Sequence, residues 1–252
     1  MRAQIREGLC HASCVREGRI SLKRVAIITA RGGSKRIPHK NIKPFLGRPI
    51  LAYSVEAALQ ADLFDEVMVS TDDEEIAQTA QRAGARVPFF RSAQTSDDFA
   101  TTADVIEEVL ASYERTGMQF EAACCIYPTA PFVTAGALRE AMELLERERA
   151  DCVIPVVKFS FPPQRGVVVK DGRLVPRWPE NMAKRSQDLE PIYHDCGQFY
   201  CLNVEQFRRQ KAIWMERAVP LIQDEIQVQD IDTQEDWAIA EMKYRILHGG
   251  ER

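Results

Sequence analysis

The feature that most constrains the fold is an alternation of short apolar runs with longer segments that carry apolar residues at helical spacing. The runs are rich in β-branched residues and almost wholly apolar, as in strands that are buried on both faces of a sheet. We predict strands at 24–30, 65–71, 85–90, 121–128 and 152–157, with helices between them at 49–64, 72–85, 102–117 and 134–150. This order predicts an α/β fold with a mostly parallel, Rossmann-like sheet flanked by helices.

The alternation breaks after residue 158. Asp171-Gly172 stands between two short strand-like runs within 166–176, which is the strongest short signal for a β-hairpin. A polar stretch at 177–195 follows, and then a strand at 197–203 and a last helix at 233–247. We predict one domain over 24–252, with 160–195 as an inserted excursion and 1–23 as a disordered leader.

Composition excludes several classes of protein. The net charge of −4 argues against a nucleic-acid binder, and no apolar run approaches the length of a membrane span. The seven cysteines are an odd number and form no disulfide framework, so we predict a cytoplasmic protein. Cys10, His11 and Cys14 are three potential metal ligands without a fourth at zinc spacing, which is a weak indication of a metal site.

The segment Ile28–Asn41, ITARGGSKRIPHKN, concentrates positive charge in this acidic chain. It leaves the carboxyl end of the first predicted strand, where open parallel sheets bind their ligands. Gly32 and Gly33 allow backbone N–H groups to approach a ligand, and Arg31, Lys35, Arg36 and Lys40 supply cations. Such a loop suits a polyphosphate. The two familiar glycine-rich phosphate motifs are absent, and a solvated basic turn stays open as an alternative.

A second motif lies near the other end of the chain, where Asp230 and Asp232 are two residues apart in QDIDTQED. Residues two apart in an extended segment point the same way, so both carboxylates could converge on one Mg²⁺ ion. The alternative is a pair of surface acids before the helix that starts near Thr233. Together, the basic loop and the acid pair predict a nucleotide held by cations, with a metal ion on its phosphates.

These residues resemble the acylneuraminate (sialic acid) cytidylyltransferase family over nearly all of 24–247. Three ordered motifs carry the resemblance, namely ARGGSKRIPHKN, FLGRPILAYSVEAA and DIDTQEDW. The resemblance implies a nucleotide-diphospho-sugar transferase type of fold and a Mg²⁺-dependent nucleotidyltransferase. Its partners would be CTP and a nine-carbon 2-keto sugar acid, and its products a CMP-sugar and pyrophosphate.

The resemblance also implies roles for individual residues. Arg31, Lys35 and Asp232 would be catalytic, and Asp230 and Asp232 would hold Mg²⁺. The nucleotide would be bound by Arg31, Gly33, Ser34, Lys35, Lys40, Asn41, Arg91 and Thr102, of which Arg91 and Thr102 match the positions that read cytosine.

Other stretches look most like the branch of the family that acts on pseudaminic acid, among them STDDEEIA, RSAQTSDDFATTADV and KRSQDLEPIYHDCGQFY. Tyr127 stands where the neuraminic enzymes carry a glutamine that contacts the sugar. The residues implied in binding the sugar acid are Tyr127, Lys184, Arg185, Gln187 and Gln198, with Lys184 or Arg185 on its carboxylate. The resemblance further implies a homodimer built on 160–195 and a role in decorating flagellin or capsule.

Three alternatives remain at this stage. The same reaction could use a neuraminic, legionaminic or Kdo-type acid. The chain could instead be a metal-dependent glycosyltransferase, although such enzymes usually place D-x-D in the middle of a domain. It could also be a silent nucleotide-binding regulator, against which the full set of Arg31, Lys35, Asp230 and Asp232 argues.

Overall fold

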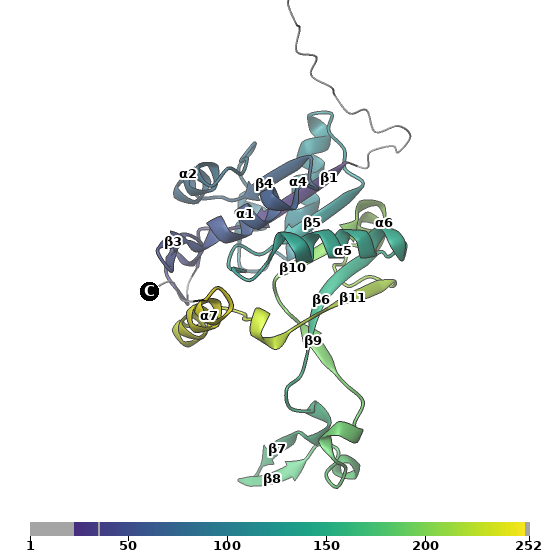
Figure 1. The fold of residues 1–252 in the computed structure, drawn as a ribbon. Helices are drawn as coiled ribbons and strands as arrows, with labels where there is room; N and C mark the ends of the chain where they lie inside the picture. The colour runs from purple at the N-terminus through teal and green to yellow at the C-terminus, as the bar shows by residue number, and fades with distance from the viewer. Residues whose placement is uncertain (1–22, 35, 250–252) are drawn as a thin grey trace, which may run out of the picture.

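The computed structural model describes residues 23–34 and 36–249, and its centre is a seven-stranded sheet (Figure 1). The strands run in the order β11-β6-β10-β5-β1-β4, and β9 also pairs with β6. Their bounds are β1 Arg24–Thr29, β4 Glu66–Ser70, β5 Ala122–Ile126, β6 Cys152–Lys158, β9 Tyr193–Asp195, β10 Phe199–Asn203 and β11 Ala218–Gln223. β1 lies parallel to both β4 and β5, and β11 lies parallel to β6, whereas β9 and β10 are antiparallel to their neighbours. The predicted mostly parallel α/β fold is confirmed.

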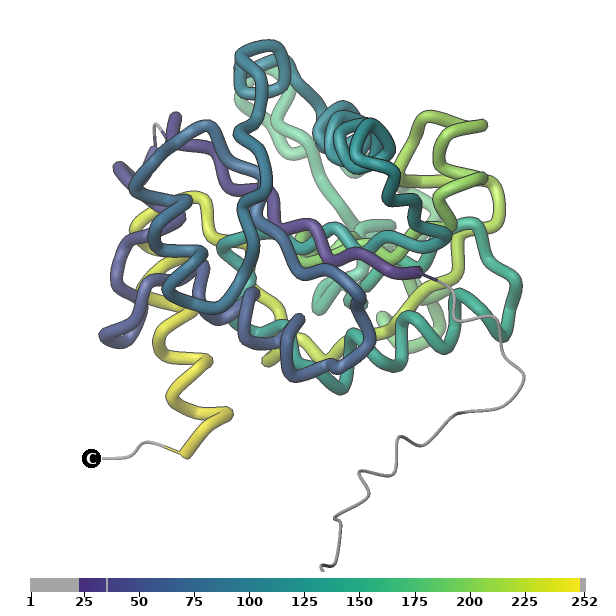
Figure 2. Tube along the Cα trace, turned by 90° about the horizontal axis from the view of Figure 1, so that it is seen from above, coloured from purple at the N-terminus to yellow at the C-terminus, as the bar shows by residue number. Residues whose placement is uncertain are grey.

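Helices cover both faces of this sheet because the strands are apolar on both sides. Val25 and Ile27 of β1 point to the face covered by α4 (Thr102–Arg115) and α6 (Val204–Gln210). Ala26 and Ile28 point to the opposite face, covered by α1 (Ile50–Ala61), α2 (Glu74–Arg82) and α5 (Ala135–Arg147). Seen from above, the sheet lies between these layers (Figure 2).

A third, smaller core joins the two ends of the chain. Ile37, Phe45 and Tyr53 from the amino-terminal part pack with Ile231 and with residues of α7 (Gln234–Leu247). Two short strands, β2 (Pro44–Phe45) and β3 (Arg48–Pro49), and the 3₁₀ turn Lys40–Ile42 shape the segment before α1. This core carries the D-x-D segment to the basic loop, although about 190 residues separate them in the sequence.

Side-chain caps begin two of the helices at the carboxyl ends of the strands. Asp73 accepts hydrogen bonds from the N–H groups of Glu75 and Ile76 and thus caps α2. Thr101 forms a capping box with Asp104 at the start of α4. Thr101 is therefore the cap, and Thr102 is the first residue of α4, with its side chain on the adjoining cavity.

The prediction of a strand at 85–90 is wrong. Only an isolated bridge joins Arg86 to Met68 of β4, and the chain then leaves the sheet. Pro88 explains the failure, since proline has no N–H group to donate to a neighbouring strand. This segment leads instead to the four-residue helix α3 (Ala93–Ser96).

The excursion is an arm that extends away from the body and ends in the hairpin of β7 (Val167–Lys170) and β8 (Arg173–Pro176) (Figure 1). Asp171 and Gly172 form its turn with positive φ values, as the sequence predicted. The leader with Cys10, His11 and Cys14 lies outside the described residues, apart from Lys23. None of the helices in the described part of the chain is long and apolar enough to cross a bilayer.

Candidate active site

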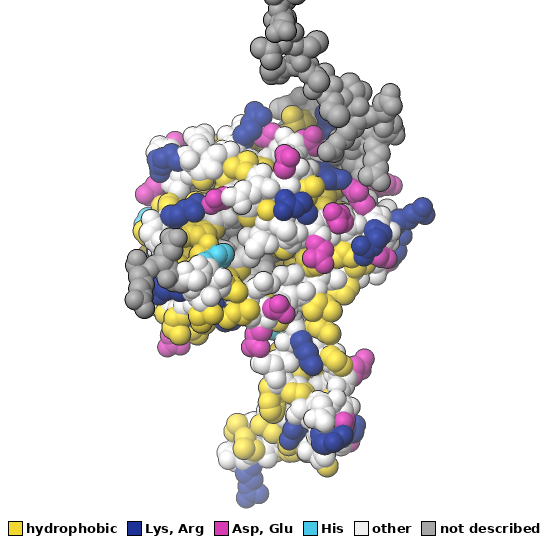
Figure 3. Space-filling model, viewed as in Figure 1, with side chains coloured by type: hydrophobic (Ala, Val, Ile, Leu, Met, Phe, Trp, Pro, Cys, Tyr) yellow, Lys and Arg dark blue, Asp and Glu magenta, His cyan; other side chains and the backbone are white. Residues whose placement is uncertain are grey.

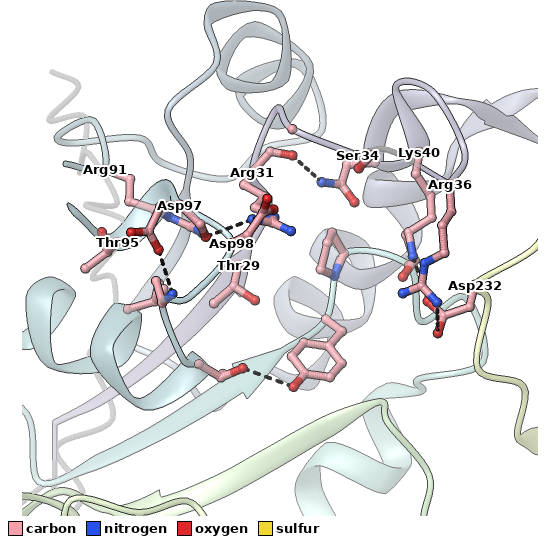
Figure 4. A pocket seen from close by; sticks show the side chains of 18 of the residues that line it. Thr29, Arg31, Ser34, Arg36, Lys40, Arg91, Thr95, Asp97, Asp98 and Asp232 are labelled. Atoms are coloured by element: carbon pink, nitrogen blue, oxygen red, sulfur yellow. Dashed lines mark hydrogen bonds and ion pairs between the residues drawn. The ribbon is translucent and has the colours of Figure 1, made fainter. Parts of the chain in front are cut away.

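A cavity of about 630 Å³ opens at the carboxyl ends of β1 and β5. It is bounded by the basic loop after β1, the segment from Arg91 through the start of α4, the turn after β5, and the D-x-D segment (Figure 4). Ten of the predicted site residues line it, namely Arg31, Gly33, Ser34, Lys40, Asn41, Arg91, Thr102, Tyr127, Asp230 and Asp232. The strand ends of a parallel sheet thus converge on one site, as expected for this architecture.

The basic loop is held in shape by its own backbone groups and by the acids between β4 and α2. The buried Asn41 donates its side-chain amide to the carbonyl oxygen of Arg31 at 2.8 Å, which ties the two ends of the loop together. The N–H group of Gly32 donates to Asp72 at 2.9 Å, so it is not free for a ligand as the sequence had suggested. A side chain at Gly32 would collide with Asp73, whereas Gly33 has open space around it. A side chain at Gly32 would therefore displace the Asp73 side chain that caps α2, whereas Gly33 lines the cavity.

The D-x-D segment faces this loop across the cavity. Ile231 is buried in the third core, so Asp230 and Asp232 turn to the opposite side and line the cavity, as the two-residue spacing predicted. Asp232 forms ion pairs with Arg36 at 2.8 Å and with Lys40 at 3.5 Å. Lys40 also donates to the carbonyl oxygen of Ile231 at 2.7 Å. Cations from one end of the chain and acids from the other therefore meet at one place.

The negative charge of Asp230 is less well compensated by neighbouring cations than the negative charge of Asp232. Burial raises the pKa of its carboxyl above the usual range, and the neighbouring charge of Asp232 raises it further. A cation beside the pair would relieve both effects. Within 23–34 and 36–249, no group of three or more His, Cys, Asp or Glu side chains is arranged to hold a metal ion. Two carboxylates still fit Mg²⁺, which commonly takes one or two carboxylates and completes its shell with substrate phosphates and water.

Arg91 is buried at the edge of the cavity, with only 8% of its surface exposed. It donates from Nε to the hydroxyl of Ser70 at 3.0 Å and from Nη2 to the Ser70 carbonyl oxygen at 2.6 Å. Burial lowers the pKa of its guanidinium, and the nearby charge of Asp72 opposes this shift. These bonds anchor the group and leave Nη1 without a partner in the described part of the protein.

Arg31 contacts two acids, Asp97 and Asp98, that the sequence analysis did not include among the site residues. Its Nη1 donates to the carbonyl oxygen of Asp97 at 2.8 Å and pairs with the carboxylate of Asp98 at 3.1 Å (Figure 4). Asp97 in turn accepts hydrogen bonds from the N–H groups of Phe99 and Ala100. Two adjacent acids just before the helix predicted at 102–117 could have been recognised in the sequence as candidate site residues. They follow a strand of the predicted parallel sheet, which would place them on the same side of that sheet as the basic loop.

Tyr127 follows β5 and joins the cavity to the interior. Its hydroxyl lies 3.1 Å from the hydroxyl of Thr102, and its ring packs edge-on against Tyr200 of β10. The hydroxyl of Tyr200 donates to Asp195 Oδ2 at 2.7 Å. The resulting row of polar side chains runs from the cavity to the end of β9.

The remaining predicted residues lie elsewhere. Lys35 is outside the described residues. Lys184, Arg185 and Gln187 lie in the arm, where Lys184 donates to Asn181 and Arg185 pairs with Asp188. Gln198 is buried and donates to the carbonyl oxygen of Gln227 at 2.7 Å, so it connects β10 to the segment that precedes the D-x-D motif. Within this single chain, none of these four described residues lines the cavity.

The fold and the cavity define an α/β protein with a nucleotide-sized polar site, and comparison with known proteins identifies its class. The sequence profile described as Cytidylyltransferase matches residues 25–229. This chain belongs to the cytidylyltransferase family and is therefore a nucleotidyltransferase.

Individual relatives agree with this family. The pseudaminic acid cytidylyltransferase of Campylobacter jejuni is 36% identical over 228 residues, which cover 90% of this chain and 98% of that protein. The CMP-N,N'-diacetyllegionaminic acid synthase of Legionella pneumophila is 33% identical, with 86% and 94% covered. A solved CMP:2-keto-3-deoxy-manno-octonic acid synthetase in complex with CTP has a TM-score of 0.63 at 19% identity, with 90% and 99% covered, and it supports the fold alone.

Proposed function

We propose that this protein activates pseudaminic acid with CTP and releases CMP-pseudaminic acid and pyrophosphate. The observation that carries the proposal is the meeting of the basic loop with the D-x-D segment, since Arg36 and Lys40 contact Asp232 at the rim of one cavity. A triphosphate needs both cations and a metal-binding acid pair at the same place. The choice of pseudaminic acid is supported by the 36% identity to an enzyme of that name.

The proposed reaction needs positioning and charge neutralisation more than a covalent intermediate. A hydroxyl oxygen of the sugar acid forms a bond to the α-phosphorus of CTP and gives up its proton to solvent, and the bond from that phosphorus to the bridging oxygen of pyrophosphate breaks. Arg31, Lys35 and Lys40 stabilise the charge on the phosphates. Arg91 and Thr102 hold the base, and Tyr127 lies beside the space left for the sugar acid.

We further propose that Asp230 and Asp232 hold Mg²⁺. When bound, the ion supplies neutralisation and polarisation of the phosphates. In the present arrangement Asp232 is paired with Arg36 and Lys40. Binding of a triphosphate would offer these two cations a new anionic partner and would release Asp232 for the metal.

Comparison of candidate sugar acids tests the substrate. The purified protein is given CTP, Mg²⁺ and, in separate reactions, pseudaminic, N-acetylneuraminic, legionaminic and Kdo-type acids, and pyrophosphate release is measured. We expect the highest kcat/KM with pseudaminic acid. Activity on another acid without activity on pseudaminate would reject the substrate, and release of a free nucleoside phosphate in place of pyrophosphate would instead indicate a glycosyltransferase.

We also propose that the arm forms a homodimer with a second copy of the chain. Apolar side chains lie on its surface, and Val169 and Leu174 are 72% and 71% exposed (Figure 3). An isolated two-stranded hairpin is marginally stable in water, so a partner surface would stabilise this one. Lys184, Arg185 and Gln187 lie on the same arm, and a dimer is the arrangement in which they could reach a sugar site.

Sedimentation at micromolar concentration checks the dimer. We expect particles of twice the 28.6 kDa chain mass for the native protein. The double variant Val169→Asp, Leu174→Asp should shift the population to monomers, because it places charges on the apolar face of the hairpin. Particles of single-chain mass for the native protein would contradict the proposal.

A further inference from the structure

Arg36 connects the basic loop to the D-x-D segment across the cavity (Figure 4). Its Nη1 lies 2.8 Å from Oδ2 of Asp232, while Nζ of Lys40 lies 3.5 Å from Oδ1 of the same carboxylate. Arg36 also lines the cavity, so it adjoins the space proposed for the triphosphate. The family resemblance implies no role for this residue.

The two cations on Asp232 are held differently. Lys40 also donates to the carbonyl oxygen of Ile231 at 2.7 Å, and its side chain is only 20% exposed, so it stays with the D-x-D segment. The side chain of Arg36 is 68% exposed, and the pair with Asp232 is its one ion pair or hydrogen bond within the described residues. Exposed ion pairs are weak. Arg36 can therefore leave Asp232 without disturbing the fold, whereas Lys40 remains.

The charges around the D-x-D segment balance in the free protein. Asp230 and Asp232 carry two negative charges. Arg36 and Lys40 carry two positive charges on the same side of the cavity. A third nearby acid, Asp236, accepts from the N–H groups that precede α7 and belongs to the cap of that helix. A divalent cation would therefore meet a neutral group with a guanidinium close by, which weakens its binding.

A triphosphate changes this balance because it offers Arg36 several phosphate oxygens. Guanidinium groups bind phosphate through paired, charge-assisted hydrogen bonds, which are stronger than an exposed pair with one carboxylate oxygen. When Arg36 moves to the phosphates, Asp232 loses one counter-ion and the acid pair regains a negative charge. The same anion thus removes the competing guanidinium and makes the carboxylates available to a cation.

We propose that Arg36 is an exchangeable counter-ion, which occupies Asp232 in the free protein and moves to the triphosphate when CTP binds, so that the nucleotide binds before the metal. The inference rests on the proposed function, because it takes Asp230 and Asp232 as the metal-binding pair. It adds a role for Arg36 and an order of binding. By linkage, Arg36 strengthens the positive coupling between nucleotide and metal.

The substitution Arg36→Ala tests metal binding and nucleotide binding separately. Mn²⁺ takes the same kind of oxygen ligands as Mg²⁺, and electron paramagnetic resonance of unbound Mn²⁺ measures its affinity for the nucleotide-free protein. We expect the variant to bind Mn²⁺ roughly tenfold more tightly than the native protein, because the competing charge is absent. Calorimetric titration of CTP in EDTA should show the opposite change, an affinity roughly fivefold to tenfold weaker, because a phosphate partner is lost.

The opposite signs distinguish this role from a structural one, since a distorted cavity would weaken both ligands. Arg147→Ala is the matched control. Arg147 is 66% exposed and pairs with Glu148 at 2.9 Å, but it does not line the cavity, so its variant should keep both native affinities. The double variant Arg36→Ala, Asp232→Asn should lose the gained Mn²⁺ affinity, because Asp232 is the ligand that Arg36 occupies.

Three results would overturn the inference. One is the same Mn²⁺ affinity, or undetectable Mn²⁺ binding, in nucleotide-free native and Arg36→Ala protein. The second is unchanged CTP affinity in Arg36→Ala, and the third is a gain in Mn²⁺ affinity that persists in the double variant. None of these results touches the proposed function, which fails instead if native protein with CTP, Mg²⁺ and the candidate sugar acids releases no pyrophosphate.

Discussion

Replacing Asp232 by asparagine is expected to lower turnover by roughly a hundredfold or more while the fold stays intact. The amide is a poor ligand for Mg²⁺, so the proposed metal site would lose one of its two carboxylates. The amide also cannot pair with Arg36 and Lys40, which contact Asp232 at 2.8 and 3.5 Å. Because these cations become available to the phosphates, CTP affinity should not weaken. Initial rates of pyrophosphate release and calorimetric titration of CTP measure the two effects separately.

Asp224→Asn is the matched control for this substitution. Asp224 is exposed in the segment that leads to the D-x-D motif and lies outside the cavity, so its variant should keep native rates. An Asp232→Asn protein with near-native turnover would remove Asp232 from the proposed metal site. A loss of turnover together with a lower midpoint of urea unfolding would indicate a structural role instead.

Replacing Arg31 by alanine should lower kcat/KM for CTP by a factor on the order of 100. Its guanidinium lies at the cavity between the basic loop and the acids at 97–98, where it can turn from these acids to a phosphate. Alanine removes the guanidinium donors and their positive charge, so their attraction for the phosphates is lost. Steady-state rates at varied CTP and fixed sugar acid measure the effect.

The matched control for Arg31→Ala is Arg48→Ala. Arg48 is also a partly exposed arginine with an acidic partner, Glu56 at 2.6 Å, but it does not line the cavity. Its replacement should change kcat/KM little. If both variants had the same activity, Arg31 would have no special part in binding the phosphates.

The sequence predicted the fold well where local patterns carry the information. The strand β1 and the helices α4 and α5 were recognisable because each apolar pattern has one period throughout its length. The segment 85–90 has the same apolar character, yet it forms only a single bridge, since Pro88 interrupts the ladder. The role of Gly32 was also misjudged, because Asp72 comes from a different part of the chain and accepts its N–H group.

Local patterns in the sequence also predicted part of the candidate site. Arg31, Lys40, Asp230 and Asp232 stand in two motifs for which we expected phosphate and metal binding, and the structure brings both motifs to one cavity. The acids Asp97 and Asp98 were missed because they contact Arg31, which is distant in the sequence.

By itself, the sequence determined the order of strands and helices, the positive charge of the first loop and the common direction of Asp230 and Asp232. These properties follow from side-chain periodicity and charge, which are local. Only the tertiary structure decided that the two motifs face each other, that Arg91 is buried beside the cavity and that the arm residues lie away from it. The physical reason is the shared core of Ile37 and Ile231, since burial of both in one apolar cluster brings the two ends of the chain together.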